Sequence, residues 1–461
     1  MLLAEQEMCV PTGTNTGSLL SCLRQHVSEM IPPDAIPVRF AVTRSDSEGY
    51  VCELGVLSGL SDLSIAEPAS IFEFVRRDLE STRAFNAVML IPTGIGAEIG
   101  GHAGDATPAA RLLASVCDTL VTHPNVVNAS DINELPENGL YVEGSVLTRL
   151  LMGTAGLLRV NANRVLLVMD KHEDMQFSEL TANAASAART TLGLDCPRIV
   201  MMDPPIRMCA EYSSSGCAVG RIEGLERLCK IVLEHRSEFD ALAVSSVIDV
   251  PKGTHMEYFE SNGRMVNPWG GIEAMLTHAI SMLFDIPTAH APMLENAEVL
   301  NMVTGIVDPR MAAEAVSSCF LHCVLKGLHR SPRIVTDRML FTHPDVLTVA
   351  NVSCLVIPDG CVGLPTLAAI EQGVPVIAVR ENRNRMRNNL AELPFARGKL
   401  FVVDNYLEAV GVMASLKAGV SVDAVRRPLA KTEVLCVRTT DTESTPQPVA
   451  REPSLKAVGG N

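Results

Sequence analysis

The chain has 461 residues, which is enough for two or three domains of average size. Its 53 Asp and Glu outnumber its 38 Lys and Arg, and the formal charge of −15 disfavours nucleic acid and anionic membrane surfaces as partners. Hydrophobic residues make up 47% of the chain and charged residues 20%, so wholesale disorder is excluded.

The sequence predicts a cytoplasmic location. No uninterrupted apolar run reaches membrane-spanning length. Glu5 and Glu7 stand where a secretory signal would need positive charge. The 13 cysteines are odd in number and follow no regular framework spacing, which is typical of reduced and mostly buried thiols.

Residues 1–84 are predicted to form a small N-terminal α+β module. Residues 37–57 read as two strands around the polar turn 45–49, which is a hairpin signal. Residues 69–85 place apolar side chains at helical spacing with charged side chains on the other face. We therefore expect a hairpin followed by a helix.

After residue 85 the chain alternates between short apolar runs and helical patterns. The runs are nearly continuous and end in Pro, Gly, Asp, His or Asn, as strands of a parallel sheet do when both faces are covered. The predicted strands are residues 87–92, 118–124, 164–170, 198–205, 241–250, 354–360, 374–382 and 399–405. The predicted helices lie between or after them, at residues 107–120, 177–194, 224–239, 271–284 and 364–373.

This alternation predicts an α/β fold with two Rossmann-like lobes, each built on a mainly parallel sheet. The first lobe is placed at residues 85–160 and carries a glycine-rich loop, and the second at residues 161–430. Residues 431–461 lack periodicity and end in a stretch rich in Thr, Ser and Pro, so we expect a mobile tail.

The glycine-rich loop, residues 92–108, is the most informative stretch. Glycines allow close backbone approach, and exposed amides beside a helix N-terminus attract anions, so a phosphate or carboxylate is the expected guest. The alternative is a long turn that simply needs glycine. The glycine spacing departs from the dinucleotide fingerprint, which disfavours a nicotinamide cofactor, and no Lys-Ser/Thr follows as in a Walker loop. The substrate-binding candidates here are Thr93, Gly94, Gly96, Gly100, Gly101 and His102.

Further candidates follow from the rule that α/β sheets bind ligands outside the carboxyl ends of their strands. Imidazoles and carboxylates gathered there would suit proton transfer, although any one of them could instead be a helix cap. The strand-end candidates for catalysis are His123, Asp170, Asp203 and Cys361. The strand-end candidates for substrate binding are Asn125, Arg380 and Asn382.

Two further candidates come from residues 268–295. His290 lies in a short extended stretch before Pro292, where it could act as an acid or base or be a buried structural histidine. Glu273 follows a predicted helix start, where it could complement the helix dipole or point into the cleft. His278, inside the same helix, is expected to be structural.

The sequence leaves the cofactor unknown. No C-x-x-C pair, H-E-x-x-H or calcium loop is present. Residues 171–174 and 254–260 contain side chains that could ligate a metal, so a divalent metal stays open.

Several long strings resemble a family of uncharacterised proteins with a domain of unknown function, common in cyanobacteria. The matching strings are IPTGIGAEIGGHAGDATPAARLLASVCDTLVTHPNVVN, LYVEG, NPWGGIEAMLTH, IPTAHAPML and DPRMAAEAVSSCFLHCVLKGLHRSPRIV. The resemblance covers residues 86–385 and implies no reaction. The chain departs from the family pattern after residue 260, where an Arg-Phe-Pro-Asp-Asp-like segment is expected, and it adds the N-terminal module and the tail.

A shorter stretch, residues 355–382, resembles the second lobe of nucleotide-sugar epimerases and two-lobed glycosyltransferases, and equally aspartate/glutamate racemases. In the epimerases and transferases a glycine turn, a helix and a strand ending in Arg-Glu-Asn hold a diphosphate, which would assign Arg380 to that role.

The leading hypothesis is an enzyme that acts on a small anionic metabolite between the two lobes, by the acid–base chemistry of an isomerase, lyase or hydrolase. One alternative is an enzyme like the nucleotide-sugar epimerases or glycosyltransferases. The other is a non-catalytic metabolite-binding protein. A homo-oligomer stays open.

Overall fold

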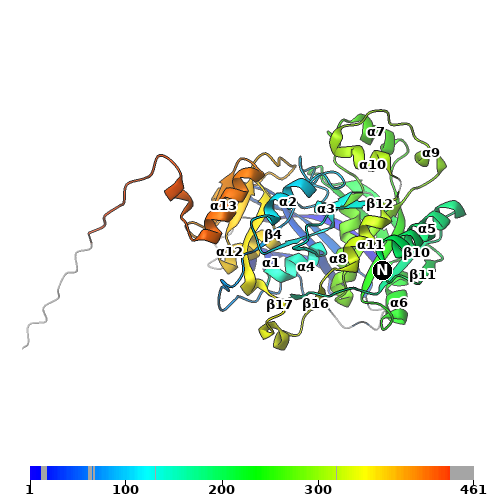
Figure 1. Cartoon of the computed structure of the whole chain (residues 1–461), viewed down its shortest axis with the longest axis horizontal. Helices are drawn as coiled ribbons and strands as arrows, with labels where there is room; N and C mark the ends of the chain where they lie inside the picture. The colour runs from blue at the N-terminus through cyan, green and yellow to red at the C-terminus, as the bar shows by residue number, and fades with distance from the viewer. Residues whose placement is uncertain (12–17, 61–64, 66–67, 130, 318, 437–461) are drawn as a thin grey trace, which may run out of the picture. The chain divides into compact units, whose positions relative to one another are not determined.

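Figure 1 shows the computed structural model, which describes residues 1–11, 18–60, 65, 68–129, 131–317 and 319–436. The chain divides into two compact units, residues 1–420 and residues 421–461. The second unit is described up to residue 436 and contains a short 3-10 turn, Val422–Val425. Most of the predicted mobile tail, residues 437–461, lies outside the described residues.

The largest sheet of the first unit is mixed and has ten strands. Their order is β11-β10-β14-β12-β13-β1-β3-β2-β19, and β15 pairs with β14. The strands β10, β11, β14 and β15 pair in parallel, β12 joins β14 in parallel, and the remaining pairs are antiparallel. The bounds are β1 Leu2–Pro11, β2 Ala35–Ser45, β3 Gly49–Ser58, β10 Val165–Asp170, β11 Ile199–Met202, β12 Arg207–Tyr212, β13 Ala218–Glu223, β14 Ala241–Asp249, β15 Thr288–Met293 and β19 Val362–Gly363.

A second sheet has six strands in the order β21-β20-β18-β4-β5-β8, and every pair in it is parallel. Its strands are β4 Asn86–Met89, β5 Thr119–Thr122, β8 Gly139–Tyr141, β18 Val352–Pro358, β20 Val376–Val379 and β21 Leu400–Val403. The small sheets contain β6 Asn128–Ala129, β7 Ile132–Asn133, β9 Gly156–Leu158, β16 Arg333–Val335 and β17 Val346–Leu347.

Helix α8 (Gly270–Phe284) packs against both β13 and β15 and against helix α4 (Gly144–Leu151). It is buried along most of its length, as its almost wholly apolar sequence requires. Its neighbour α11 (Leu321–His329) packs on β14 and β15. The other helices are α1 Leu19–Met30, α2 Thr107–Ala114, α3 Pro124–Val127, α5 Met175–Leu192, α6 Leu225–His235, α7 Thr254–Glu260, α9 Ala297–Leu300, α10 Ala312–Val316, α12 Leu364–Gln372 and α13 Tyr406–Ala418.

The structure confirms every strand predicted beyond residue 85, and the N-terminal hairpin is present as β2 and β3. The helix predicted at residues 69–85 is wrong, because these residues contain no helix. Tertiary hydrogen bonds hold this backbone instead: Val75 N donates to Met152 O at 2.9 Å, and Gln372 Nε2 donates to Val75 O at 2.8 Å. The apolar side chains Ile71 and Phe72 are buried without a helix.

The α/β class is confirmed, but two Rossmann-like lobes are not. The ten-stranded sheet joins β1, β2 and β3 of the predicted N-terminal module to β10–β15. The parallel sheet joins strands from residues 86–141 to strands from residues 352–403, so it draws on both predicted lobes. Hydrophobic runs fix which segments are strands, whereas pairing between distant segments depends on tertiary packing that periodicity does not report.

Within the described residues, no single helix is long and apolar enough to cross a membrane. One bent pair of helical segments, Pro309–Val316 and Leu321–His329, meets the criterion by length and composition.

Candidate functional site

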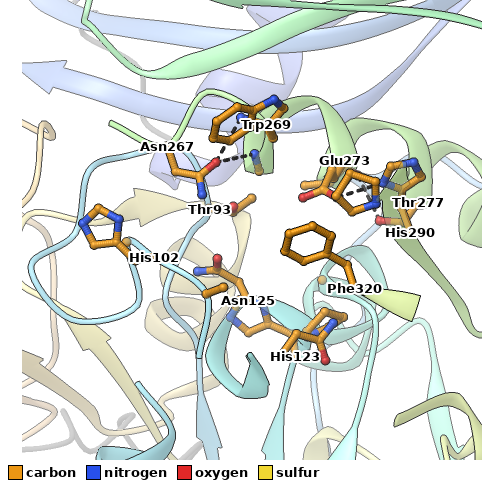
Figure 2. Close-up of a pocket in the computed structure, with 18 of the residues that line it drawn as sticks. Thr93, His102, His123, Asn125, Asn267, Trp269, Glu273, Thr277, His290 and Phe320 are labelled. Carbon is orange, nitrogen blue, oxygen red and sulfur yellow. Dashed lines mark hydrogen bonds and ion pairs between the residues drawn. The ribbon is translucent and has the colours of Figure 1, made fainter. Parts of the chain in front are cut away.

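A cavity of about 520 Å³ opens where the carboxyl ends of strands from both sheets meet helix α8. Thr93 follows β4, His123 follows β5, Cys361 follows β18, and His290 lies in β15. The volume is that of a small-metabolite site, for which pockets of roughly 300–1,000 Å³ are usual. Figure 2 shows part of its wall.

The first feature of the wall is a carboxylate–histidine pair, Glu143 and His278. Glu143 is the N-cap of α4, accepting from Ser145 N at 2.9 Å, and its Oε1 lies 2.5 Å from His278 Nδ1. Thr277 also donates to Oε1, at 3.2 Å. Burial of Glu143 favours its neutral form, but the charge and hydrogen bonds of His278 and Ser145 outweigh it and lower the pKa of Glu143. The pair therefore holds a buried carboxylate in its ionised form.

A glycine makes this close pairing sterically possible. A Cβ on Gly144 would lie 2.8 Å from His278 Cε1, so a larger residue would push the imidazole away from the start of α4. His278 Nε2 has no hydrogen-bond partner among the described residues, and 18% of the side chain is exposed to the cavity, against 2% for Glu143. His278, expected to be structural, thus presents a nitrogen to the cavity.

The second pair is Glu273 and His290. His290 Nδ1 lies 2.8 Å from Glu273 Oε1 (Figure 2), and its Nε2 lies 2.8 Å from Ser246 Oγ, so both ring nitrogens are engaged. The His290 side chain is fully buried, whereas 26% of the Glu273 side chain is exposed. Ser246 is fully buried and does not line the cavity. The group that this triad offers to a ligand is therefore the Glu273 carboxylate rather than a serine or His290 itself.

His123, Asn125 and Thr93 line the cavity from the parallel sheet (Figure 2). His123 Nε2 accepts from Ile91 N at 3.0 Å, and burial lowers the pKa of His123 to about 4, so the ring is neutral and its proton lies on Nδ1. Asn125 donates both amide hydrogens, to Ile91 O at 3.1 Å and Gly100 O at 2.8 Å. This leaves its carbonyl oxygen for a ligand.

The amides of the glycine-rich loop serve internal carboxylates. Gly100 N donates to Asp105 Oδ1 at 2.8 Å, and Ala103 N donates to Glu314 Oε1 at 2.8 Å. Burial raises the pKa of both Asp105 and Glu314 to about 7. Two of the loop amides are therefore satisfied by carboxyl groups of the protein itself, which weakens the argument for an anionic ligand.

An aromatic and amide cluster links the loop to helix α7. His102 Nδ1 lies 2.7 Å from Tyr258 Oη, and burial lowers the pKa of His102 to about 4. Asn267 accepts from Trp269 N at 3.0 Å and Gly270 N at 3.2 Å, which caps the start of α8. The Trp269 ring packs edge-on against Tyr258 with centroids 5.1 Å apart, so Trp269 is fixed as part of the wall.

Arg39 lines the cavity from β2 and is paired with two acidic side chains. Its Nη1 donates to Glu5 Oε1 at 2.6 Å, and its Nη2 lies 3.5 Å from Glu53 Oε2. Burial raises the pKa of Glu5 to about 7 despite the neighbouring guanidinium. The positive charge of Arg39 is therefore already compensated inside the protein.

The structure brings together part of the predicted site. The predicted residues that line the cavity are Thr93, Gly101, His102, His123, Asn125, Glu273, His290 and Cys361. Burial raises the pKa of the Cys361 thiol well above its usual range, which opposes a nucleophilic thiolate.

The other predicted residues do not line the cavity. Three of them, Gly94, Gly96 and Gly100, are glycines with a positive backbone φ. A Cβ on Gly94 would lie 2.6 Å from Ala218 O, so this glycine serves the turn itself. Asn382 is fully buried and binds both Ile99 N and Ile99 O, which pins the glycine-rich loop.

Three charged candidates also lie away from the cavity. Asp170 is buried at the end of β10 and accepts from Ile206 N at 3.2 Å. Asp203 forms an exposed ion pair with Lys171 at 2.6 Å. Arg380 forms an exposed ion pair with Asp404 at 3.1 Å, so it does not support the diphosphate role that residues 355–382 suggested.

Sequence reasoning missed Arg39, Glu143 and Glu314. Glu143 had a usable signal, since it follows β8 and precedes a helix, where an acidic residue caps the first amides. Arg39 and Glu314 carried no signal, because their approach to the cavity depends on the pairing of β2 and on the path of residues 294–317. Within the described part of the chain, no group of three or more His, Cys, Asp or Glu is placed to hold a metal ion.

Fold and site together define an α/β protein with one metabolite-sized cavity carrying two carboxylate–histidine pairs. Residues 86–426 match the family of proteins of unknown function DUF3326, and the chain belongs to that family. It is 33% identical over 339 residues to an uncharacterized lipoprotein of Synechococcus sp., an alignment that covers 73% of this chain and 92% of that relative. No solved structure matches the chain.

The name of this relative contradicts the predicted cytoplasmic location, because it is called a lipoprotein. The prediction rested on the charge of the first residues, on hydropathy and on the cysteines, and none of these reports covalent attachment of lipid. The cytoplasmic assignment is therefore withdrawn.

Proposed function

We propose that the protein is an enzyme that converts a small polar metabolite by acid–base chemistry in the cavity beside α8. The observation that carries the proposal is the contact of 2.5 Å between His278 Nδ1 and Glu143 Oε1, with Nε2 open to the cavity. A histidine whose second nitrogen is held by a buried carboxylate is the usual arrangement of a general base.

In this proposal His278 Nε2 removes a proton from the substrate. Glu143 holds the other ring nitrogen in its protonated tautomer and stabilises the imidazolium as it forms. Glu273 binds the substrate and is positioned by His290. Because both nitrogens of His290 are engaged, His290 is a positioning residue here rather than the acid or base.

The proposal retains acid–base chemistry and gives up the anionic charge of the substrate. That charge was argued from the loop amides, and two of these, Gly100 N and Ala103 N, already donate to Asp105 and Glu314. Arg39 does not replace them, because Glu5 and Glu53 compensate its charge.

Turnover of an unidentified substrate can be tested by metabolite profiling. The full-length protein is incubated with a small-molecule cell extract, and the loss and gain of compounds is followed by mass spectrometry. We expect the wild-type protein to convert at least one compound and His278→Asn to lose the conversion by about 10²–10⁴-fold.

The matched control is His343→Asn, since His343 is exposed and pairs only with Asp345. It should convert the compound at the wild-type rate. No conversion by the wild-type protein, or full activity of His278→Asn, would overturn the proposal in favour of a non-catalytic binding protein.

A further inference from the structure

The side chains of the cavity wall offer at least three hydrogen-bond acceptors that the described residues leave free. Glu273 Oε2 has no hydrogen bond, because only Oε1 contacts His290. Asn125 donates both of its amide hydrogens to backbone carbonyls, and its Oδ1 accepts no hydrogen bond from the described residues. In the tautomer that the proposed base requires, with the proton on Nδ1, His278 adds its Nε2 as a third acceptor. None of these three atoms has a partner among the described residues.

Several hydroxyls on the wall already donate to the protein, and the indole N–H of Trp269 adds a further donor to the wall. Thr148 donates to Gly144 O at 3.1 Å, and Thr366 donates to Cys361 O at 2.9 Å. The protein leaves His123 Nδ1 free as a donor, and His123 is only 7% exposed. The Thr93 hydroxyl has no partner in the described part of the chain and can either donate or accept.

The charges on the wall favour a positively charged ligand. The carboxylates of Glu143 and Glu273 line the cavity, whereas burial raises the pKa of Glu314 to about 7 and also raises the pKa of Glu295. The Arg39 guanidinium is already paired with Glu5 at 2.6 Å, and burial keeps His102 and His123 neutral by lowering the pKa of each to about 4. Among the described residues that line the cavity, a bound anion would therefore meet two carboxylates and an arginine that is already paired, whereas a bound cation would be stabilised.

The remaining wall is apolar. Phe320, Phe259 and Trp269 face the cavity, and Met293 and Met302 add flexible thioethers. Phe320 and Glu273 appear together in Figure 2, so an apolar surface and a carboxylate border the same space. This combination suits a ligand with a compact hydrocarbon body and one strongly donating end.

We propose that the substrate is a small amine, whose ammonium group is held by Glu273 Oε2 and Asn125 Oδ1 while its hydrocarbon part packs on Phe320. This inference rests on the proposed function, since it names the substrate class of the same cavity.

The test is isothermal titration calorimetry of the full-length protein with three amines, ethanolamine, putrescine and tyramine, and with the carboxylates that match them in length, glycolate, succinate and 4-hydroxyphenylacetate. We expect at least one amine to bind at millimolar concentration or below, and at least about tenfold more tightly than its carboxylate counterpart, because a hydrogen bond between an ammonium and a carboxylate is charge-assisted. Equal or tighter binding of the carboxylates, or no binding of any amine, would overturn the inference. The neutral polyol myo-inositol is titrated as a further ligand. Tighter binding of myo-inositol than of the amines would also overturn the inference, because the free acceptors would then serve hydroxyl groups.

Glu273→Gln should weaken the amine by at least about tenfold and abolish the preference over the carboxylate. Glu273→Asp keeps the charge and should keep the sign of the preference, which separates loss of charge from loss of fold. The matched control is Glu179→Gln, because Glu179 is exposed on α5 and does not line the cavity. An unchanged amine affinity in Glu273→Gln would contradict the inference.

The two proposals fail separately. Amine binding without any conversion in metabolite profiling would refute the enzyme and leave the ligand class standing. Conversion of a compound together with preferred binding of carboxylates would refute the amine as substrate class and leave the proposed enzyme standing.

Discussion

The Glu314 carboxylate accepts a hydrogen bond of 2.8 Å from Ala103 N and another of 3.3 Å from Asn267 Nδ2. It thereby ties the segment of residues 294–317 to the glycine-rich loop and to the start of α8. Beside this contact, Met311 packs with Tyr258 and Phe259 in a small apolar cluster of its own, and α7, α9 and α10 lie together in Figure 1. A buried carboxyl group and the ion pair of 2.9 Å between Arg310 and Glu98 thus both link the outer wall of the cavity to the glycine-rich loop.

Glu314 should make stability depend on pH. Burial raises the pKa of Glu314 to about 7 from the usual 4.5, so the folded protein holds a proton that the unfolded chain releases between those values. Folding stability from this group is therefore full below about pH 4.5 and falls as the pH rises to about 7. Glu314→Gln should remove on the order of 2 kcal/mol of that decline.

The measurement is the free energy of unfolding by urea at pH 5 and pH 7.5. The groups that face Glu314 are Asp105, Glu273, Tyr258 and the loop amides, and Asp105 shares the raised pKa and should add to the decline. Glu260→Gln, on the exposed side of α7, should leave the pH dependence as in the wild type. An equal decline in Glu314→Gln would show that this carboxylate does not titrate in the window.

Glu143→Gln should show whether the charge of Glu143 supports catalysis by His278 or whether the side chain only supports the fold. Glutamine keeps an oxygen for Ser145 N, but it no longer stabilises a positive charge on His278. We expect the protein to fold and the conversion seen in metabolite profiling to slow by about 10²–10⁴-fold. A conversion rate within twofold of wild type would exclude Glu143 from the mechanism, and Glu408→Gln on the exposed part of α13 provides the matched control.

The sequence was sufficient to predict most strands, because an unbroken apolar run such as residues 165–169 is buried whichever strand it pairs with. The rule that ligands bind at the carboxyl ends of parallel strands selected His123, which lines the cavity, whereas Glu273 and His290 were selected from residues 268–295 and reach the cavity from α8 and from β15 of the other sheet. The helix expected at residues 69–85 failed because Val75 and Gln372 bond across almost 300 residues. Local periodicity contains no information on such a contact.

The same limit explains the errors at the site. The sequence does not distinguish a strand-end aspartate that faces a cavity from one that faces elsewhere. Asp170 accepts from a backbone amide and Asp203 pairs with an exposed lysine, yet both stand near the end of a predicted strand. His278 resembled a core histidine because its neighbours in α8 are apolar, and only its spatial contact with Glu143 distinguishes it. The glycine-rich loop was correctly placed beside the cavity, but its internal partners Asp105 and Glu314 were not foreseen.

Asn382→Ala should destabilise the protein through the same loop. The side chain is fully buried and makes three hydrogen bonds, to Ile99 N at 2.9 Å, Ile99 O at 2.8 Å and Tyr406 Oη at 2.8 Å. Removing it leaves these groups without partners, and we expect a loss of about 2–4 kcal/mol in the free energy of unfolding. Asn301→Ala removes an exposed amide and should cost less than about 0.5 kcal/mol. Equal losses for the two variants would show that Asn382 does not pin the loop.

Asp105→Ala should convert the loop into the anion site that its glycines suggested. The Asp105 carboxylate accepts from Gly100 N at 2.8 Å, and its removal would leave that amide without this partner and the space of the carboxylate empty. We expect the variant to lose about 1–3 kcal/mol in the free energy of unfolding, and formate or acetate to restore part of this loss by occupying that space.

The readout is the melting temperature of the variant and of the wild type, measured with sodium formate or with sodium chloride at equal ionic strength. The variant should gain several degrees in formate relative to chloride, whereas the wild type should show no difference between the two salts. Asp105→Asn, which retains an acceptor oxygen for Gly100 N, should also show none. An equal response of the variant to formate and to chloride would contradict this prediction. It would mean that the loop collapses once the Asp105 carboxylate is removed, so that its amides no longer form an anion-binding site.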